Sequence, residues 1–195
     1  DLERQRLIGI LATWLEVEGS RDISFTVELS EESLEWDCDG LNLSLKVDRV
    51  DRLSTGQRIV IDYKSSAGQS AIDWSQSPLK SPQLPCYSQV ITDVETIAIG
   101  QVSINEPGYL TLGADIGLDD ADKKSKKAMD RAGVSELAGL KDQWLVDLRS
   151  LVSAFVNGSG TPTPSPSACR YCHYAAICRA HAVSDWDAEE DISGE

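Results

Sequence analysis

The stretch that decides the fold is VDRVDRLSTGQRIVIDYK, residues 47–64. It predicts two β-strands joined by a turn, because the β-branched residues 59–61 follow a Ser-Thr-Gly-Gln turn signal. Side chains alternate along a strand, so Asp62 and Lys64 point to one face while Tyr63 points to the other. A carboxylate beside an ammonium can hold a hard divalent cation and steady a water molecule or a phosphate. The end of the second strand is therefore a candidate catalytic site.

A second acid is expected from the first of these strands. Polar and apolar residues alternate from Leu41 to Asp48, which places Asp48 on the polar face and gives Asp51 the parity of the core face. We therefore expect Asp48, rather than Asp51, to be the second metal ligand. For Asp48 and Asp62 to share a face, the connection must contain an odd number of residues, or one strand must carry a bulge. The alternative is a solvated ion pair of Asp62 with Lys64, contributing less than about 1 kcal/mol.

Composition describes an acidic globular protein. The chain has 195 residues, 41% of them hydrophobic and 26% charged, which suits one domain with a core of its own. It contains no apolar run long enough to span a membrane and no secretory signal. Because it starts at Asp1, within a segment of helical pattern, we expect a processed chain or the C-terminal piece of a longer protein. The net charge of −14 argues against a general polyanion binder, so nucleic acid would have to be met by bound cations and a local basic strip.

Hydrophobic periodicity predicts a chain of both helices and strands. Besides the two strands above, we expect helices at 1–17, 82–94 and 134–157 and strands at 22–29, 33–38, 96–104 and 109–114. A turn is expected at Glu31 and Glu32. The first helix is expected to pack on the sheet, and the last helix to carry Leu151 and Phe155 on its apolar stripe. Between these elements, residues 65–81 form a long loop over the candidate site. Trp74 in this loop is expected either to stack on a base or to anchor the loop itself.

Three further groups of side chains are candidates for the same site. Gln83 and Tyr87 lie four residues apart on one helix face and would reach the site if their helix lies beside the strand ends. Glu28, on a neighbouring strand, can share the cation or be a surface acid. Lys123 and Lys124 belong to the basic cluster of the chain and can contact phosphate or form a solvated loop.

Cysteine spacing indicates a second metal centre. Cys169, Cys172 and Cys178 follow a C-x2-C-x5-C pattern, and thiolates are soft metal ligands typical of a reducing, cytoplasmic setting. His181 can complete a Cys3His zinc site. Alternatively, the three cysteines hold an iron–sulfur cluster with a fourth cysteine from elsewhere.

The chain thus divides into three parts. We expect a core over residues 1–160, a cysteine-rich segment over 161–182 and an acidic disordered tail over 183–195. The last fourteen residues contain six acids and no base, so the charge without them is still −8.

Four motifs in this order resemble the RecB/AddB-like, iron–sulfur-stapled nucleases of the PD-(D/E)XK superfamily. They are the residues 47–51, 61–66 and 83–87 and the three late cysteines. The resemblance implies an α/β fold with a restriction-endonuclease-like core, a central mixed sheet of about five strands flanked by helices. It further implies a metal-dependent DNA nuclease, expected to be an exonuclease of DNA repair and recombination. It also implies a helicase subunit or an upstream helicase-like region as partner.

The resemblance assigns roles to individual residues. Asp48 and Asp62 would bind Mg²⁺ or Mn²⁺, and Lys64 would orient the attacking water and stabilise charge on the phosphate. Gln83 and Tyr87 would contact DNA near the scissile phosphate, while the late cysteines would hold a 4Fe-4S cluster. Two other functions stay open: a non-catalytic DNA-binding or scaffolding domain of a helicase–nuclease complex, and a zinc-stapled interaction module.

Overall fold

A computed structural model describes residues 2–65, 70–77, 79–117, 125–127, 129–131, 133–159, 169–170 and 172–178. The chain forms two compact units, Asp1–Ser153 and Ala154–Glu195. The second contains the one-turn helix α6 (Ala175–Cys178). Within the described residues, none of the helices combines the length and the apolar character needed to cross a membrane.

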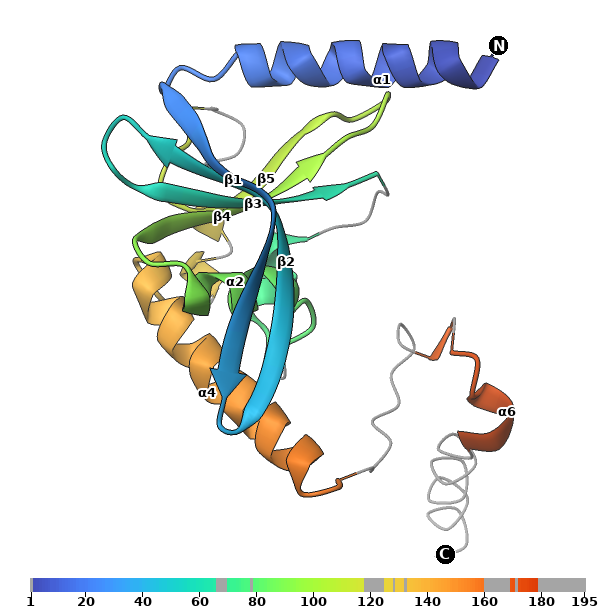
Figure 1. Ribbon diagram of the computed structural model, residues 1–195, viewed down its shortest axis with the longest axis vertical. Coiled ribbons are helices and arrows are strands. Elements are labelled where there is room, and N and C mark those ends of the chain that lie inside the picture. Colours follow the sequence, from blue (N-terminus) through green and yellow to red (C-terminus); the bar gives the residue numbers. More distant parts are fainter. Residues whose placement is uncertain are drawn as a thin grey trace, which may run out of the picture. The chain divides into compact units, whose positions relative to one another are not determined.

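The first unit is built on a five-stranded mixed sheet (Figure 1). Its strands follow the chain in the order β1 (Phe25–Cys38), β2 (Leu41–Leu53), β3 (Arg58–Lys64), β4 (Val94–Gln101) and β5 (Gly108–Gly113). Neighbouring strands are antiparallel except β3 and β4, which are parallel. The helices are α1 (Leu2–Gly19), η1 (Ala71–Ser75), α2 (Gln83–Val90) and α4 (Leu137–Val156). The predicted mixed sheet flanked by helices is confirmed.

The first two strands form one long hairpin, in place of the two short strands predicted before residue 39. The turn expected at Glu31 is absent, and β1 continues through it with Glu31 at a φ of 54°. The reversal occurs instead at Asp39 and Gly40, whose φ values are 50° and 87°. Asp-Gly is a strong signal for a two-residue hairpin turn, because both positions must adopt positive φ.

The parallel pairing of β3 and β4 positions the site. Parallel strands need a crossover, and here residues 65–93 supply it with η1 and α2. The first residue of α2 therefore returns to the end of the sheet where β3 finishes. Pro82 and Pro85 fit this start, since the first turn of a helix needs no hydrogen-bonded amide there.

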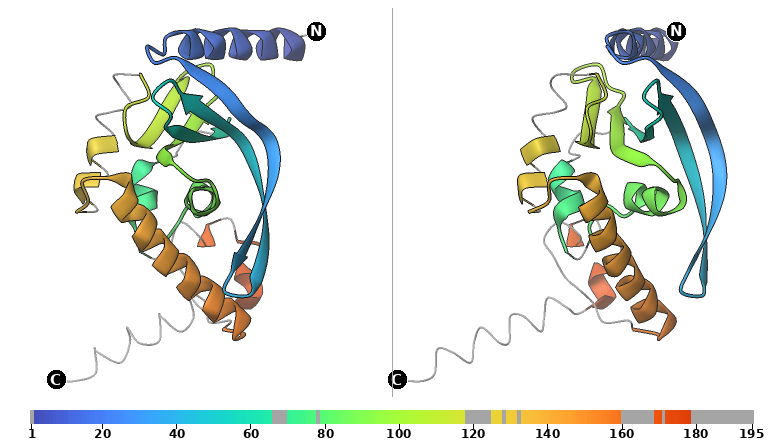
Figure 2. Two further views of the ribbon diagram at one scale, coloured as in Figure 1. Left: turned by 60° about the vertical axis from the view of Figure 1, so that its left-hand side comes forward. Right: turned by 90° about the vertical axis from the view of Figure 1, so that its left-hand side faces the viewer.

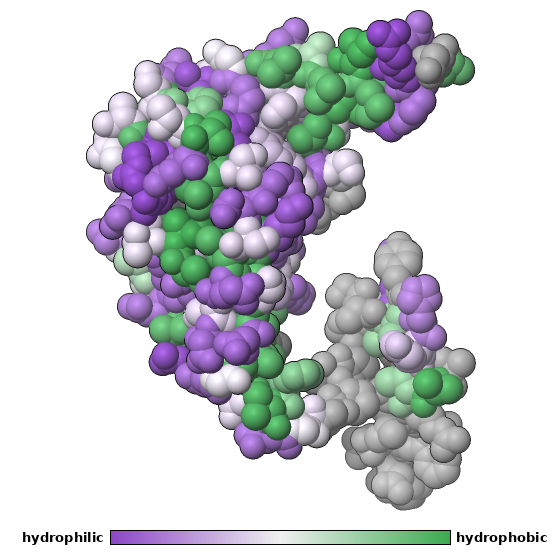
Figure 3. Space-filling model, in the orientation of Figure 1, coloured by the Kyte–Doolittle hydropathy of each residue, from purple (hydrophilic) through white to green (hydrophobic). Residues whose placement is uncertain are grey.

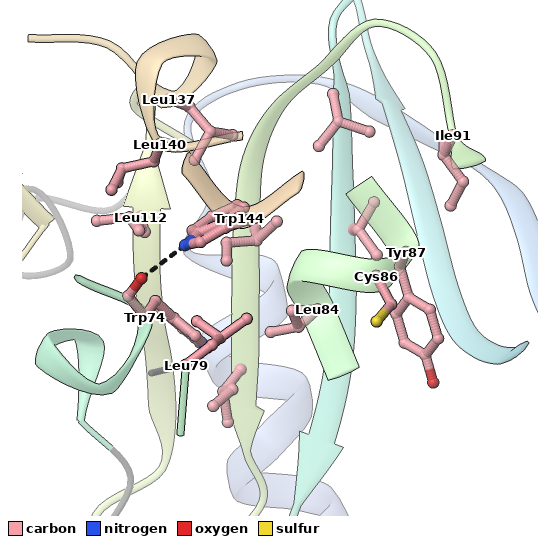
Figure 4. Close-up of a cluster of buried hydrophobic side chains, with 14 of the residues drawn as sticks. Trp74, Leu79, Leu84, Cys86, Tyr87, Ile91, Leu112, Leu137, Leu140 and Trp144 are labelled. Carbon is pink, nitrogen blue, oxygen red and sulfur yellow. Dashed lines mark hydrogen bonds between the residues drawn. The ribbon is translucent and has the colours of Figure 1, made fainter. Parts of the chain in front are cut away.

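Both faces of the sheet are covered, and Figure 2 shows α1 and α4 on opposite sides of it. On one face, η1, α2 and α4 enclose the larger apolar cluster, in which the Trp144 indole donates to the Trp74 carbonyl at 2.6 Å (Figure 4). Trp74 is therefore a core residue that anchors its own loop, not a surface for a base. On the other face, Trp14 of α1 packs with Ile59, Ile61 and neighbours.

Two predicted helix faces differ from the structure. On α4 the buried stripe continues through Val152, so that Leu151 and Phe155, assigned to it from the sequence, are exposed. On α1, Trp14 is the one buried residue, and the expected packing along the sheet is otherwise missing. The exposed apolar side chains of α1 gather at the upper right of Figure 3: Leu2, Leu7, Ile8, Leu11 and Leu15.

Candidate active site

The two acids of the quoted stretch are brought together where β2 and β3 separate. The β2–β3 ladder runs from Arg52–Arg58 to Arg49–Ile61, and five residues lie between Arg52 and Arg58. This odd number is what the shared face of Asp48 and Asp62 requires. Beyond the pair Arg49–Ile61, a side chain takes the place of the backbone partner: Asp48 Oδ2 accepts a hydrogen bond from the Tyr63 amide at 2.8 Å.

Asp62 is notable for its burial and for its incomplete hydrogen bonding. Its side chain is 3% exposed, and its Oδ2 lies 2.7 Å from Lys64 Nζ. Its buried Oδ1 has no hydrogen-bond partner among the residues that the structure describes. Burial raises the pKa of Asp62, and the charge of Asp48 adds to this rise, while the ammonium of Lys64 opposes it. Burying a carboxylate oxygen without a partner costs free energy, so binding a cation or a proton at Oδ1 would be favourable.

Helix α2 holds Lys64 from the other side. Lys64 Nζ donates to Gln83 Oε1 at 3.1 Å, and Gln83 Nε2 donates to the Tyr87 hydroxyl at 2.8 Å. The Tyr87 hydroxyl in turn donates to the Lys46 carbonyl of β2 at 2.5 Å. In Figure 4 the phenol extends from α2 with its hydroxyl pointing away from the neighbouring apolar side chains. The predicted Gln-x-x-x-Tyr face thus joins α2 to both strands of the site.

These side chains line a cavity of about 460 Å³. Its polar contributors include Asp62, Lys64 and Gln83, and its apolar wall includes Trp74 and Leu84. Asp62 and Lys64 thus face one cavity, while Asp48 stands opposite Asp62 in the register of β2 and β3. Carboxylates can hold a hard cation, and the ammonium can bind an anion beside it.

Comparison with known families identifies the family of the chain. The family profile of the PD-(D/E)XK nuclease superfamily matches residues 2–179. The chain belongs to the PD-(D/E)XK nuclease superfamily. No curated protein matches it. Among solved structures it is similar to one titled "Crystal structure of SSO0001", with a TM-score of 0.39 and 15% sequence identity over 89% of this chain and 68% of that chain.

Glu28, a predicted contributor to the site, is paired elsewhere in this superfamily member. Glu28 accepts hydrogen bonds from Arg58 at 2.7 and 2.8 Å and from Arg52 at 2.9 Å. Arg58 begins β3, whereas Asp62 lies near its end, so Glu28 is paired at the opposite end of the strand and is not a ligand of this site. Lys123 and Lys124 lie outside the described residues.

The alternative ligand Asp51 has a different role from Asp48 in this nuclease fold. It is fully buried on the opposite face, as its parity predicted, where Arg21 Nη1 and Arg49 Nε each donate to it at 2.6 Å. Arg49 also donates to Glu18 and to the Tyr63 hydroxyl. Sequence reasoning missed this ion cluster, although Arg49, two residues before Asp51 and of the same parity, was a usable signal.

The late cysteines of this superfamily member do not form a ligand set. Cys172 is exposed, Cys169 and Cys178 are half-buried, and all three are free thiols. In the part of the chain that the structure describes, no group of three His, Cys, Asp or Glu side chains is arranged to hold a metal. His181 lies outside that part. The cluster and the zinc site therefore stay predictions, and no chemistry is derived from either.

Proposed function

We propose that this chain is the nuclease domain of a larger protein, and that it hydrolyses phosphodiester bonds of DNA with Mg²⁺ or Mn²⁺ at Asp48 and Asp62. The observation that carries the proposal is Asp62 Oδ1, a buried carboxylate oxygen without a partner beside a second carboxylate and a lysine. Hard oxygen donors fit these ions, and Mg²⁺ is commonly bound by one or two carboxylates with substrate phosphate and water completing its shell. The absence of a third acid among the described residues is compatible with that chemistry.

The cation would supply an activated water and neutralise charge on the phosphate. The residues of the chain do the rest. Lys64 compensates Asp62 and carries an ammonium that can donate to a phosphate oxygen or to the attacking water. Gln83 holds that ammonium in place, and Tyr87 fixes Gln83 against β2. Excluding bulk water from Asp62 strengthens each of these interactions, because the local dielectric is low.

The finer parts of the proposal are an exonuclease mode, a role in DNA repair or recombination, and the RecB/AddB-like type with a helicase partner. Their support is the order of the four motifs along the chain. A cytoplasmic location is proposed on the same grounds, together with the three free cysteines of the second unit. Linear and circular DNA separate the exonuclease mode from its alternative: we expect the linear substrate to be degraded and the circular one to be spared.

The decisive experiment compares Asp62→Asn with the wild type on end-labelled linear DNA in Mg²⁺. We expect hydrolysis to fall at least about a thousandfold, because metal activation contributes several kcal/mol to the barrier. Glu106→Gln, an exposed acid in the β4–β5 turn, is the matched control and should be as active as the wild type.

Manganese binding, followed by electron paramagnetic resonance, separates the two classes of function. A nuclease should bind Mn²⁺ in the wild type and lose it in Asp62→Asn with the fold intact. A scaffolding domain should bind DNA, show no Mn²⁺ site and cleave nothing. Equal cleavage by the wild type and Asp62→Asn would show that the site is assigned to the wrong residues.

A further inference from the structure

The guanidinium of Arg49 lies on the face of the sheet opposite the cavity, yet it connects to the strand that carries the site. Its Nε and Nη2 donate to Asp51 at 2.6 and 3.0 Å, and its Nη1 and Nη2 donate to Glu18 at 3.1 and 3.3 Å. Its Nη1 also donates to the Tyr63 hydroxyl at 2.8 Å. The Arg49 side chain is 14% exposed, so its position is fixed by these bonds and not by solvent.

Tyr63 lies between Asp62 and Lys64 and is held from three sides. Its amide donates to Asp48 Oδ2, and its hydroxyl accepts from Arg49. Its ring packs on Trp14, edge to face at 5.6 Å between centroids. The ring also lies over Gly100 of β4, where a Cβ would come within 2.6 Å of Tyr63 Cδ1. Gly100 is therefore needed for the ring to lie flat on the sheet.

The end of β3 depends on these contacts. The β2–β3 ladder stops at Ile61, whereas β3 continues to Lys64. Residues 62–64 pair with β4 but not with β2. On the side that faces β2, the Tyr63 amide donates a hydrogen bond to the Asp48 carboxylate. A strand end bound on one side can shift or twist more readily than a strand paired on both.

We propose that Arg49 and Tyr63 are positioning residues that set the geometry of Asp48, Asp62 and Lys64 from the opposite face of the sheet. Arg49 fixes the phenol of Tyr63, and Tyr63 fixes the strand on which Asp62 and Lys64 stand. Arg49 also directly follows Asp48, so one guanidinium constrains both acids through the backbone. The inference rests on the proposed function, because it concerns the same two carboxylates.

A purely stabilising role for this ion cluster is the competing explanation, and the cluster contains its own control. Tyr109 of β5 also contributes its hydroxyl, which donates to Glu18. It packs on Trp14 at 5.1 Å between centroids. Tyr109→Phe and Tyr63→Phe therefore each remove one hydroxyl from one cluster and keep the ring contact with Trp14. Only Tyr63 lies on the strand that carries the site.

The test measures kcat, KM for DNA, Mn²⁺ affinity and thermal unfolding for the two variants. We expect similar losses of stability. Tyr63→Phe should lower kcat about tenfold, because small misplacements of catalytic groups are costly. Its KM should stay within about twofold, and Tyr109→Phe should leave both constants within that range. Mn²⁺ should bind several-fold more weakly in Tyr63→Phe alone.

The double variant Arg49→Lys/Tyr63→Phe tests whether Arg49 acts through Tyr63. If it does, the double variant should be no slower than Arg49→Lys alone, because the two changes interrupt the same connection. Fully additive losses in kcat would overturn that link.

Hydrogen exchange of the peptide covering residues 61–65 gives a readout that needs no activity. We expect faster exchange there in Tyr63→Phe and unchanged exchange in Tyr109→Phe. Equal effects of the two variants on kcat and exchange, or no effect of Tyr63→Phe on either, would overturn the proposal. A wild type that neither binds Mn²⁺ nor cleaves DNA would instead reject the proposed function, while the exchange comparison would still decide whether Tyr63 positions the strand end.

Discussion

Replacing Asp51 with alanine should make this protein unfold far more readily, while the folded variant keeps the proposed ligands Asp48 and Asp62 and binds Mn²⁺ with an affinity lowered no further than in Tyr63→Phe. Asp51 is fully buried and accepts three hydrogen bonds, one from Arg21 and two from Arg49. The Arg21 side chain is completely buried, and its Nε and Nη2 already lack partners. Without Asp51, its remaining acid is Glu18 at 3.6 Å.

The expected loss of unfolding free energy follows from the buried charge of Arg21, which Asp51 no longer compensates. Breaking a buried ion pair by removing one partner typically costs about 3–5 kcal/mol. For a domain of this size, each kcal/mol lowers Tm by about 2–4 °C, so Asp51→Ala should melt roughly 6–20 °C below the wild type. Denaturant unfolding followed by tryptophan fluorescence, together with calorimetry, measures both quantities.

Two further variants separate a loss of stability from a loss of Mn²⁺ binding. Arg21→Met in the Asp51→Ala background should recover part of the lost stability, since it removes the orphaned charge. Asp48→Asn should show the reverse pattern, with weakened Mn²⁺ binding and a loss of stability near that of one hydrogen bond, about 1 kcal/mol. A folded Asp51→Ala protein that binds Mn²⁺ as weakly as Asp48→Asn, or one whose stability changes by less than about 1 kcal/mol, would refute the reasoning.

Two further predictions concern side chains away from the cavity. Hydrogen bonds from Arg58 and then Arg52 lower the pKa of Glu28 from 4.5 to about 2, so its stabilisation is complete above pH 4.5 and disappears as the pH falls toward 2. Glu28→Gln should therefore lower the free energy of unfolding by up to about 1 kcal/mol at pH 7, and denaturant titrations should show it converging with the wild type near pH 2. The variant should keep full Mn²⁺ binding, and loss of that binding would show that Glu28 belongs to the site. Burial raises the pKa of Cys86 to about 11, whereas Cys172 is exposed. Iodoacetamide at pH 7.5 should accordingly label Cys172 and spare Cys86 until denaturant is added, as peptide mass spectrometry can show, and equal labelling in the folded protein would contradict the packing of α2.

The sequence was informative where chemistry is local. Alternation along β2 predicted the burial of Asp51 and the separate face of Asp48, and the odd spacing between the strands follows the requirement set by that alternation. The Asp-Gly pair at residues 39–40 carried an equally local signal for the hairpin turn. The turn was instead predicted at residues 31–32, because acidic residues on an exposed strand of a hairpin resemble the polar residues of a turn.

The parts that could not be predicted depend on contacts distant in sequence. Glu18 and Arg49 are thirty-one residues apart, and nothing in either segment indicates that α1 brings its last turn to β2. The same limit applies to Glu28: its strand was predicted, but a bulge between Val27 and Leu29 changes the register there. Register shifts of one residue reverse the face of every side chain beyond them, so single acids on edge strands are poorly placed from sequence alone.

Charge at the cavity explains how an acidic protein can act on a polyanion. Asp62 and Lys64 form an ion pair, and Lys46 is paired with Glu31 at 2.5 Å, so neither lysine offers a free positive charge to an approaching phosphate. With Asp48 included, these five side chains carry one more negative than positive charge. These five side chains therefore offer no surplus positive charge to attract the DNA that we propose as substrate. A divalent cation held by Asp48 and Asp62 would reverse the sign locally, which makes occupation of the carboxylate pair a condition for binding substrate as well as for activating water.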